Sequence, residues 1–378
     1  MEKLKIITIL GTRPEIIRLS RIMAMLDIHF DHRVVHTGQN HDYELNEIFF
    51  EDMNIRKPDF FLGAATGSFA STIGKIITEI DLILEKEVPD GILILGDTNS
   101  SLSAIAAKKR KIPIFHMEAG NRCFDQRVPE ETNRKIVDHI ADINMTYSNL
   151  AKDYLIREGF PPDQVIKVGS PMKEVINFNK NKINRSLILE KLNLKKNNYF
   201  LVSAHREENI DSDIMFRNLI DILNYLDSEY SEEVIVSTHP RTRKKIDKIE
   251  SNILNKNIKF LKPINFSDYN KLQIESKAVL SDSGTINEES SILNFKALNI
   301  REAHERPESV EETSTIMTGL NLNRVKQGLK IIDDQLTGDT RNFNEVNDYQ
   351  NINISEKIAR IIVSHIDFIN RKVWLKKY

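Results

Sequence analysis

The sequence predicts two α/β domains, each a doubly wound sheet of parallel strands. The chain has 378 residues, of which 40% are hydrophobic, so it can form two hydrophobic cores. Short β-branched runs alternate with longer stretches that have room for crossover helices, which is the pattern of a parallel sheet. The alternation stops once, in a polar segment rich in Asn and Lys, and then restarts.

The predicted strands fall into one group on each side of that polar segment. The first group is 4–10, 34–37, 92–95, 112–117 and 143–147, and the second is 199–203, 234–238, 258–261, 278–281 and 297–300. We expect a linker near residues 170–197. Residues 354–374 carry apolar side chains at helical spacing and predict one amphipathic helix.

Composition argues against several classes of protein. There are 53 basic and 55 acidic residues, so no net field would attract nucleic acid or anionic lipid. Cys123 is the one cysteine and cannot form an internal disulfide, and the N-terminus lacks the pattern of a signal peptide. No stretch approaches the roughly 18 apolar residues of a membrane span. We therefore expect a cytoplasmic protein without membrane insertion.

The segment 11–15 (GTRPE) directly follows the first predicted strand. Thr12 and Glu15 have capping-box spacing, and Pro14 falls in the first turn, so a helix begins here. Arg13 stands where a cation opposes the helix dipole, and a nearby anion would explain it. The alternative is an ordinary capped structural helix.

Three acids are predicted to gather at one rim. Asp97 and Glu118 each follow a strand, and Glu130 lies in the first turn of a helix opened by Pro129. Ligands of doubly wound sheets bind beyond the carboxyl ends of the strands, so two such domains side by side form a cleft. Grouped carboxylates change one another's proton affinity, as general acid–base chemistry requires. Glu131 alone is better interpreted as a helix-dipole partner.

The second domain carries basic residues and small polar residues at strand ends. His205 and Arg206 follow one strand, and His239 follows the next, also close to an arginine, which predicts a site for a phosphate and a proton. Residues 283–285 (SGT) predict a phosphate cradle at a helix N-terminus, with an ordinary Ser N-cap as the alternative. Arg306 adds charge after the strand that ends at residue 300.

Cofactor and metal motifs are missing from the sequence. No G-x-G-x-x-G follows a strand, no Walker A motif is present, and no Cys/His spacing fits zinc. We therefore expect no cofactor and no metal, and we expect acids, histidines and arginines to supply the chemistry.

The motifs GTRPE, GDT, MEAGNR, PEETNR, SAHREEN, THP and SDSGTINEE followed by HERPE resemble, in this order, those of the non-hydrolysing UDP-N-acetylglucosamine 2-epimerases. The resemblance spans nearly the whole chain. It implies the glycosyltransferase-B architecture, with two Rossmann-like domains facing across a cleft, a C-terminal helix that crosses back to the first domain, and usually a homodimer. The domains would comprise 1–170 with 355–378, and 171–354.

The resemblance also implies a mechanism and roles for individual residues. The sugar C2 proton leaves as UDP departs from C1, and UDP then re-adds. Asp97, Glu118 and Glu130 would be the acid–base carboxylates, and His205 would help UDP to leave. The substrate-binding residues implied or predicted are Arg13, Arg18, Arg206, His239, Ser283, Gly284, Thr285, Glu289 and Arg306, with Glu289 on the ribose hydroxyls.

Two departures from the family pattern bear on the substrate. Relatives that act on UDP-N-acetylglucosamine typically have Lys where this chain has Arg18, and Gln-His-Arg where residues 39–41 are Gln-Asn-His. The second run resembles part of an activating nucleotide site, so we expect that activation to be lost. Segments 120–123 and 299–306 resemble the branch that makes UDP-N-acetyl-L-fucosamine from its 6-deoxy-L-talose epimer, for capsule or O-antigen synthesis.

Other functions remain open at this point. UDP-N-acetylglucosamine is the alternative substrate, and a glycosyltransferase, or a hydrolysing epimerase that releases free sugar, is the alternative enzyme on the same fold. A non-catalytic sugar-nucleotide sensor is disfavoured, because it would have no use for Asp97, Glu118, Glu130 and His205 together.

Overall fold

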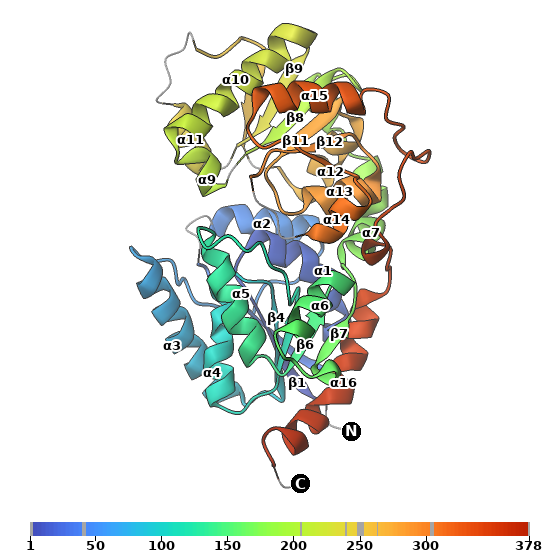
Figure 1. Ribbon diagram of the computed structural model, residues 1–378. Coiled ribbons are helices and arrows are strands. Elements are labelled where there is room, and N and C mark those ends of the chain that lie inside the picture. Colours follow the sequence, from blue (N-terminus) through green and yellow to red (C-terminus); the bar gives the residue numbers. More distant parts are fainter. Residues whose placement is uncertain are drawn as a thin grey trace. The chain divides into compact units, whose positions relative to one another are not determined.

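The computed structural model describes residues 3–39, 43–204, 206–238, 240–247, 253–262, 264–302 and 306–376. The chain divides into two compact units, Met1–Phe178 with Asp348–Tyr378, and Asn179–Asn347 (Figure 1). Each unit contains one sheet whose strands all pair in parallel. The predicted fold class is therefore confirmed.

The first unit has the strand order β3-β2-β1-β4-β5-β6-β7. Its strands are β1 Lys5–Leu10, β2 Asp31–His36, β3 Phe60–Phe61, β4 Gly91–Leu95, β5 Ile114–Met117, β6 Ile143–Thr146 and β7 Val165–Lys167. Its helices are α1 Arg13–His29, α2 Tyr43–Asp52, α3 Phe69–Glu87, α4 Ala104–Lys109, α5 Pro129–Ile140, α6 Asn149–Arg157 and α16 Ile354–Lys372, and short 3-10 helices cover Asn99–Ser103 and Pro162–Gln164.

Helices cover both faces of this sheet. Ile7 and Ile9 of β1 pack into one apolar cluster with α3, α4 and α5, which lie on the same face. Helix α3 contributes Ile76, Ile80 and Leu84, at the four-residue spacing of one helix face. On the chain's return to this unit, α16 packs against α1 (Figure 1). The predicted C-terminal helix that rejoins the first domain is thus confirmed.

The second unit has the strand order β10-β9-β8-β11-β12-β13. Its strands are β8 Tyr199–Ser203, β9 Glu233–Ser237, β10 Ile258–Leu261, β11 Ala278–Ser281, β12 Ala297–Asn299 and β13 Ile316–Met317. Its helices are α8 Ile188–Leu192, α9 Glu207–Ile210, α10 Asp213–Tyr230, α11 Pro240–Ile246, α12 Phe266–Glu275, α13 Ile286–Leu293, α14 Pro307–Glu311 and α15 Leu322–Ile332, with a 3-10 turn at Asn347–Tyr349 near the boundary.

Strand β8 shows why this sheet needs helices on both sides. Phe200 and Val202 pack into a cluster with α10 and α15, whereas Tyr199 and Leu201 pack into a second cluster with α8 and α12. Successive side chains of a strand point to opposite faces of the sheet. A strand made only of apolar residues must therefore be covered by helices on both faces.

The polar segment expected to be a linker is mostly helical. Helix α7, Met172–Asn184, begins in the first unit and ends in the second, and α8 follows it. Val175, Ile176 and Ile183 are buried at helical spacing, which the surrounding Asn and Lys residues conceal in the sequence. The short edge strands β3, β7 and β13 were also not predicted, because two or three residues show no periodicity.

In each sheet, predicted motifs follow the two strands between which the strand order reverses direction. In the first unit the chain runs outward in opposite directions from β1 and β4, and in the second from β8 and β11. A crevice forms beyond the carboxyl ends of such strand pairs. The segments that follow these four strands are the predicted motifs. Among the helices in the described parts of the chain, none has the length and apolarity to cross a bilayer.

Candidate active site

The carboxylate of Glu118 lies at the carboxyl end of β5 and is held by α1. Arg18 Nη1 donates to Glu118 Oε2 at 2.7 Å, and the Arg18 side chain is almost completely buried. Asn121 Nδ2 lies 3.4 Å from the other carboxylate oxygen. The Glu118 backbone has φ of 60°, a left-handed conformation that is unfavourable for a residue with a Cβ.

Asp97 lies at the end of the neighbouring strand β4 and is held by α5. Arg134 Nη2 and Nε contact Asp97 Oδ2 at 2.7 and 2.9 Å. Asn133 of the same helix donates to the Asp97 backbone carbonyl at 3.0 Å. A Cβ placed on Gly96 would lie 3.9 Å from Glu118 Oε2, so the two acidic segments are adjacent. The structure thus brings Arg18, Asp97 and Glu118 together at one rim.

The two acids in the first turn of α5 differ in environment. Glu130 is partly exposed and lies one turn before Arg134, the residue that binds Asp97. Glu131 is fully buried and accepts hydrogen bonds from the Cys123 backbone N–H, at 3.2 Å, and from Arg134 Nη1, at 3.1 Å. Glu131 therefore anchors the loop after β5, a more specific role than that of a helix-dipole partner.

Glu15 joins the loop after β1 to the loop after β4. Its Oε2 accepts from the backbone N–H groups of Gly11 and Thr12 at 2.8 and 2.7 Å, and its Oε1 accepts from the Thr98 hydroxyl at 2.8 Å. The Glu15 half of the predicted capping box is thus formed. Burial raises the pKa of Glu15 to about 7, although these hydrogen bonds lower it. Arg13 is the first residue of α1, and its guanidinium carbon lies 5.5 Å from the Phe49 ring centroid.

The second unit has a polar turn at the start of α13. The Ser283 hydroxyl lies 3.0 Å from the Thr285 hydroxyl and accepts from the Thr285 N–H at 3.3 Å. The Ser283 hydroxyl thus accepts an N–H at the start of α13, as a capping serine does, whereas the side chain of Thr285 makes no cap hydrogen bond. The alternative of a Ser N-cap therefore stays open beside the phosphate cradle. A Cβ placed on Gly284 would lie 3.7 Å from Arg206 Nη2 and 4.0 Å from Arg301 Nη1. Two guanidinium groups therefore flank a turn that carries two hydroxyls at the start of a helix, an arrangement suited to a phosphate.

Asp282 fixes one of these arginine-bearing loops. Its buried carboxylate accepts from the Arg206 backbone N–H at 2.9 Å and from Asn209 Nδ2 at 3.1 Å. The loop after β8 is consequently tied to the loop after β11 across the switch point. His205, next to Arg206, and His239 lie outside the described residues.

Glu289 and Arg306 are both buried. Glu289 is one turn into α13 and accepts from Gln273 Nε2 at 2.7 Å. Arg306 Nη2 lies 3.5 Å from Glu288 Oε2, and its Nη1 lies 3.9 Å from Glu308 Oε1. Arg306 thus forms ion pairs with Glu308 and with Glu288 of α13, the helix that follows the 283–285 turn.

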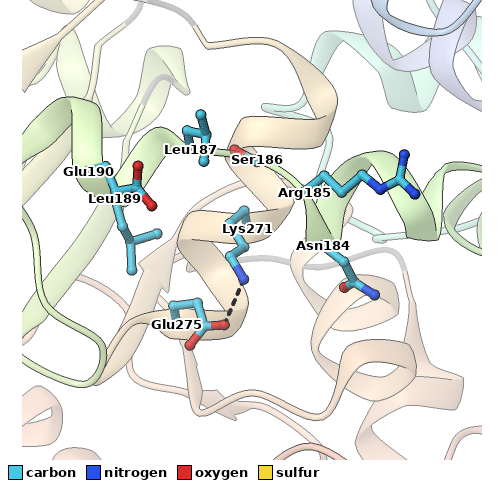
Figure 2. Close-up of a pocket in the computed structure, with 8 residues that line it drawn as sticks. All are labelled: Asn184, Arg185, Ser186, Leu187, Leu189, Glu190, Lys271 and Glu275. Atoms are coloured by element: carbon cyan, nitrogen blue, oxygen red, sulfur yellow. Dashed lines mark hydrogen bonds and ion pairs between the residues drawn. The ribbon is translucent and has the colours of Figure 1, made fainter.

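A surface hollow in the second unit lies away from these groups. Figure 2 shows that α12 and the segment from the end of α7 to α8 line it, with Lys271 paired to Glu275 at 2.9 Å. None of the described site residues lines this hollow. Within the described ranges, no group of His, Cys, Asp and Glu side chains has the arrangement of a metal site.

Sequence reasoning missed three residues of these sites as individual contributors: Arg134, Asp282 and Arg301. Arg134 stands four residues after Glu130, a spacing that places both on one helix face. Asp282 immediately follows β11, and Arg301 is the second residue after β12. That placement was the available signal, because polar residues directly after parallel strands face the ligand edge of the sheet.

Comparisons with known proteins give one consistent family. The model described as UDP-N-acetylglucosamine 2-epimerase matches residues 25–363. The UDP-N-acetylglucosamine 2-epimerase of Methanocaldococcus jannaschii is 33% identical over 376 residues, covering 95% of this chain and 99% of that protein. The UDP-2,3-diacetamido-2,3-dideoxy-D-glucuronate 2-epimerase of Pseudomonas aeruginosa is 32% identical over 321 residues, covering 84% and 88%.

Solved structures that resemble this chain belong to the same family. The structure of UDP-N-acetylglucosamine 2-epimerase from Rickettsia bellii has a TM-score of 0.93 and 51% identity, covering 99% of this chain and 100% of that chain. The M. jannaschii enzyme in complex with UDP-GlcNAc and UDP has a TM-score of 0.88 and 33% identity, covering 96% and 100%. The chain therefore belongs to the UDP-N-acetylglucosamine 2-epimerase family, which makes it an isomerase.

Proposed function

We propose that this protein inverts C2 of a UDP-N-acetylhexosamine by eliminating UDP and adding it back. The observation that carries the proposal is the pair of carboxylates on adjacent strands, Asp97 and Glu118, each bound by a buried arginine from a different helix. Inversion at carbon needs a base on one face and an acid on the other, and two separately oriented carboxylates meet that need.

The proposed route avoids an unstable anion. No carbonyl adjoins C2 of the sugar, so a carbanion there would have no resonance stabilisation. If a carboxylate takes the C2 proton while the C1–O bond to UDP breaks, the electron pair forms the C1–C2 double bond of a glycal and UDP carries away the negative charge. In the second half, a UDP oxygen bonds to C1 and a carboxylic acid returns a proton to the other face of C2. Asp97, Glu118 and Glu130 are the proposed proton carriers.

UDP binding is assigned mainly to the second unit. Ser283, Gly284 and Thr285 offer hydroxyl and N–H donors at the start of α13, and Arg206 adds charge, which matches a diphosphate. Glu289 is assigned to the ribose hydroxyls. Arg13, His205, His239 and Arg306 complete the proposed set, with His205 assisting departure of UDP.

The proposed sugar is the 6-deoxy-L-talose nucleotide, which would give UDP-N-acetyl-L-fucosamine. This choice is supported by segments 120–123 and 299–306 and by Arg18 in place of the usual lysine. UDP-N-acetylglucosamine is the second candidate. It is favoured by the similarity to the R. bellii UDP-N-acetylglucosamine 2-epimerase, at 51% identity, and to the M. jannaschii enzyme that was solved with UDP-GlcNAc and UDP.

Deuterium exchange at C2 tests both parts of the proposal, the epimerisation reaction and the identity of the sugar. The protein is incubated in D2O with each nucleotide separately, without any acceptor, and C2 is followed by NMR. We expect deuterium at C2 of the L-fucosamine nucleotide and none in UDP-N-acetylglucosamine. The reverse result would select the second candidate. Consumption of nucleotide that requires an acceptor and leaves C2 unlabelled would indicate a transferase and overturn the proposal.

A further inference from the structure

His116 is a fully buried histidine on β5 that the proposed reaction does not use. Its Nε2 lies 2.8 Å from the Gly96 carbonyl oxygen, and its Nδ1 lies 3.1 Å from Asp138 Oδ1. Both partners are acceptors, so both ring nitrogens must carry a proton. The geometry therefore defines His116 as an imidazolium.

Asp138, on α5, binds more than the imidazolium. Its Oδ1 accepts from the Gly120 backbone N–H at 3.2 Å, and its Oδ2 accepts from Arg122 Nη1 at 2.7 Å. Arg122 is bound on its far side by Glu158 at 2.7 Å. Burial opposes the charge on His116, but the Asp138 carboxylate outweighs it and raises the His116 pKa. Burial likewise opposes the charge on Asp138, and His116 and Arg122 lower its pKa.

The two glycines that contact this pair flank the proposed reactive acids. Gly96 precedes Asp97, and Gly120 is two residues after Glu118. Both glycines have left-handed backbones, with φ of 69° and 80°. At Gly120 a Cβ would also lie 2.4 Å from the Ala151 carbonyl, so no larger residue fits. One buried ion pair therefore holds both loops through a single backbone group in each.

We propose that His116 and Asp138 are positioning residues that keep the Asp97 and Glu118 loops in register for proton transfer. The proposal rests on the proposed function, because Asp97 and Glu118 are its proton carriers. His116 and Asp138 act without touching the substrate. Their effect on turnover comes from the placement of the two carboxylates, and a displacement of about 1 Å can cost ~10²-fold in rate.

The variant Asp138→Asn tests this, with Asp142→Asn as the matched control. Asp142 is also buried, also paired with a cation, Lys108, and also accepts a backbone N–H, that of Ile114. Ile114 is the first residue of β5, whereas the Gly120 N–H bound by Asp138 lies in the loop after this strand. We expect Asp138→Asn to lower kcat about 10²-fold with little change in KM or UDP affinity, and Asp142→Asn to leave kcat nearly unchanged. His116→Gln keeps one donor for the Gly96 carbonyl, so it should retain more activity than His116→Leu.

Amide hydrogen exchange gives a readout that does not depend on activity. In Asp138→Asn, exchange should increase in peptides that contain residues 96–98 and 118–122, and it should stay unchanged there in Asp142→Asn. Unchanged exchange, or equal losses of kcat in both variants, would overturn the positioning role. Failure of the proposed function would appear differently, as turnover retained when Asp97 and Glu118 themselves are replaced by their amides.

Discussion

The two units carry their predicted functional residues at equivalent points of two similar sheets, beyond the carboxyl ends of the central strands. The chemical groups found there differ between the units. In the first unit, side chain binds side chain: Arg18 holds Glu118, and Arg134 holds Asp97. In the second unit, one continuous turn, 283–285, carries two hydroxyl groups that lie 3.0 Å apart at the start of α13. Proton transfer requires carboxylates whose orientation is fixed, whereas an anion can be bound by the N-terminus of a helix.

The difference also extends to how far apart the partners lie in the chain. Glu15 binds Thr98, Arg18 binds Glu118, and Asp97 binds Arg134, so the first unit depends on long-range pairs. The second unit's turn is local, with Arg206 and Arg301 added at its side. If the proposed roles hold, substitution of the Asp97 and Glu118 carboxylates should mainly lower the rate, and substitution of Arg206 and Ser283 should mainly weaken nucleotide binding.

The largest effect is expected for the rim carboxylates. Replacing Asp97, Glu118 or Glu130 by the amide should lower turnover by at least ~10²-fold, because each variant loses one of the proposed general acids or bases. UDP affinity, measured by calorimetry, should change little, since the residues proposed to bind UDP lie mainly in the second unit. Full turnover in all three variants would remove the mechanistic distinction between the units.

The buried carboxyl group of Glu15 should affect the stability of the fold, through the pH dependence of the free energy of unfolding. Its folded-state pKa of about 7 lies above the ordinary 4.5, which corresponds to about 3 kcal/mol. A raised pKa contributes stability that is fully present below the unfolded-state pKa and is lost as pH rises through the folded value. The wild type should therefore lose up to about 3 kcal/mol of unfolding free energy relative to Glu15→Gln between pH 4.5 and about 8. Parallel pH dependences in urea unfolding would contradict this.

The next effect concerns the second unit. Arg206→Ala should weaken UDP binding by about 10- to 150-fold, the equivalent of a lost charge-assisted hydrogen bond, and Ser283→Ala should weaken it less. The kcat at saturating substrate should fall much less than affinity, because the proposed role of these groups is to bind UDP in both the substrate and the product. Replacement of Arg324, an exposed arginine on α15 that contacts Gln327, is the control. Unchanged UDP affinity in Arg206→Ala would show that the turn is not the UDP site.

Much of this arrangement could be predicted from the sequence, and the missing part has a common cause. Alternating apolar runs revealed the central strands, and motifs directly after them revealed which residues meet at the switch points. The sequence does not show that Arg18 binds Glu118 rather than a ligand, because that pair joins residues 100 positions apart. It also does not show that His116 and Asp138 form a pair, since a histidine within an apolar run looks like any other core residue. Helix α7 was missed because its buried stripe is narrow and its other residues are polar.

The last prediction is that an added nucleotide has no effect on the rate. It tests whether the first unit contains a second site for an anion. UDP-N-acetylglucosamine should not activate the enzyme. Residues 39–41 are Gln-Asn-His where activated relatives have Gln-His-Arg, and an imidazole cannot replace a permanently charged planar fork. Asn40 and His41 lie outside the described residues, but Gln39 Oε1 accepts from the Ser100 N–H at 3.1 Å.

Arg18 and Arg206 are the two cations that could compensate, and Arg18 binds Glu118 at 2.7 Å instead. A second nucleotide bound through Arg18 would have to break that pair and would thereby disturb the proposed acid–base site. Initial rates with the L-fucosamine nucleotide should therefore stay flat, or fall by competition, across a titration of UDP-N-acetylglucosamine. A clear rise in rate would mean that the first unit binds an anion with donors other than these, and the contrast between the two units would fail.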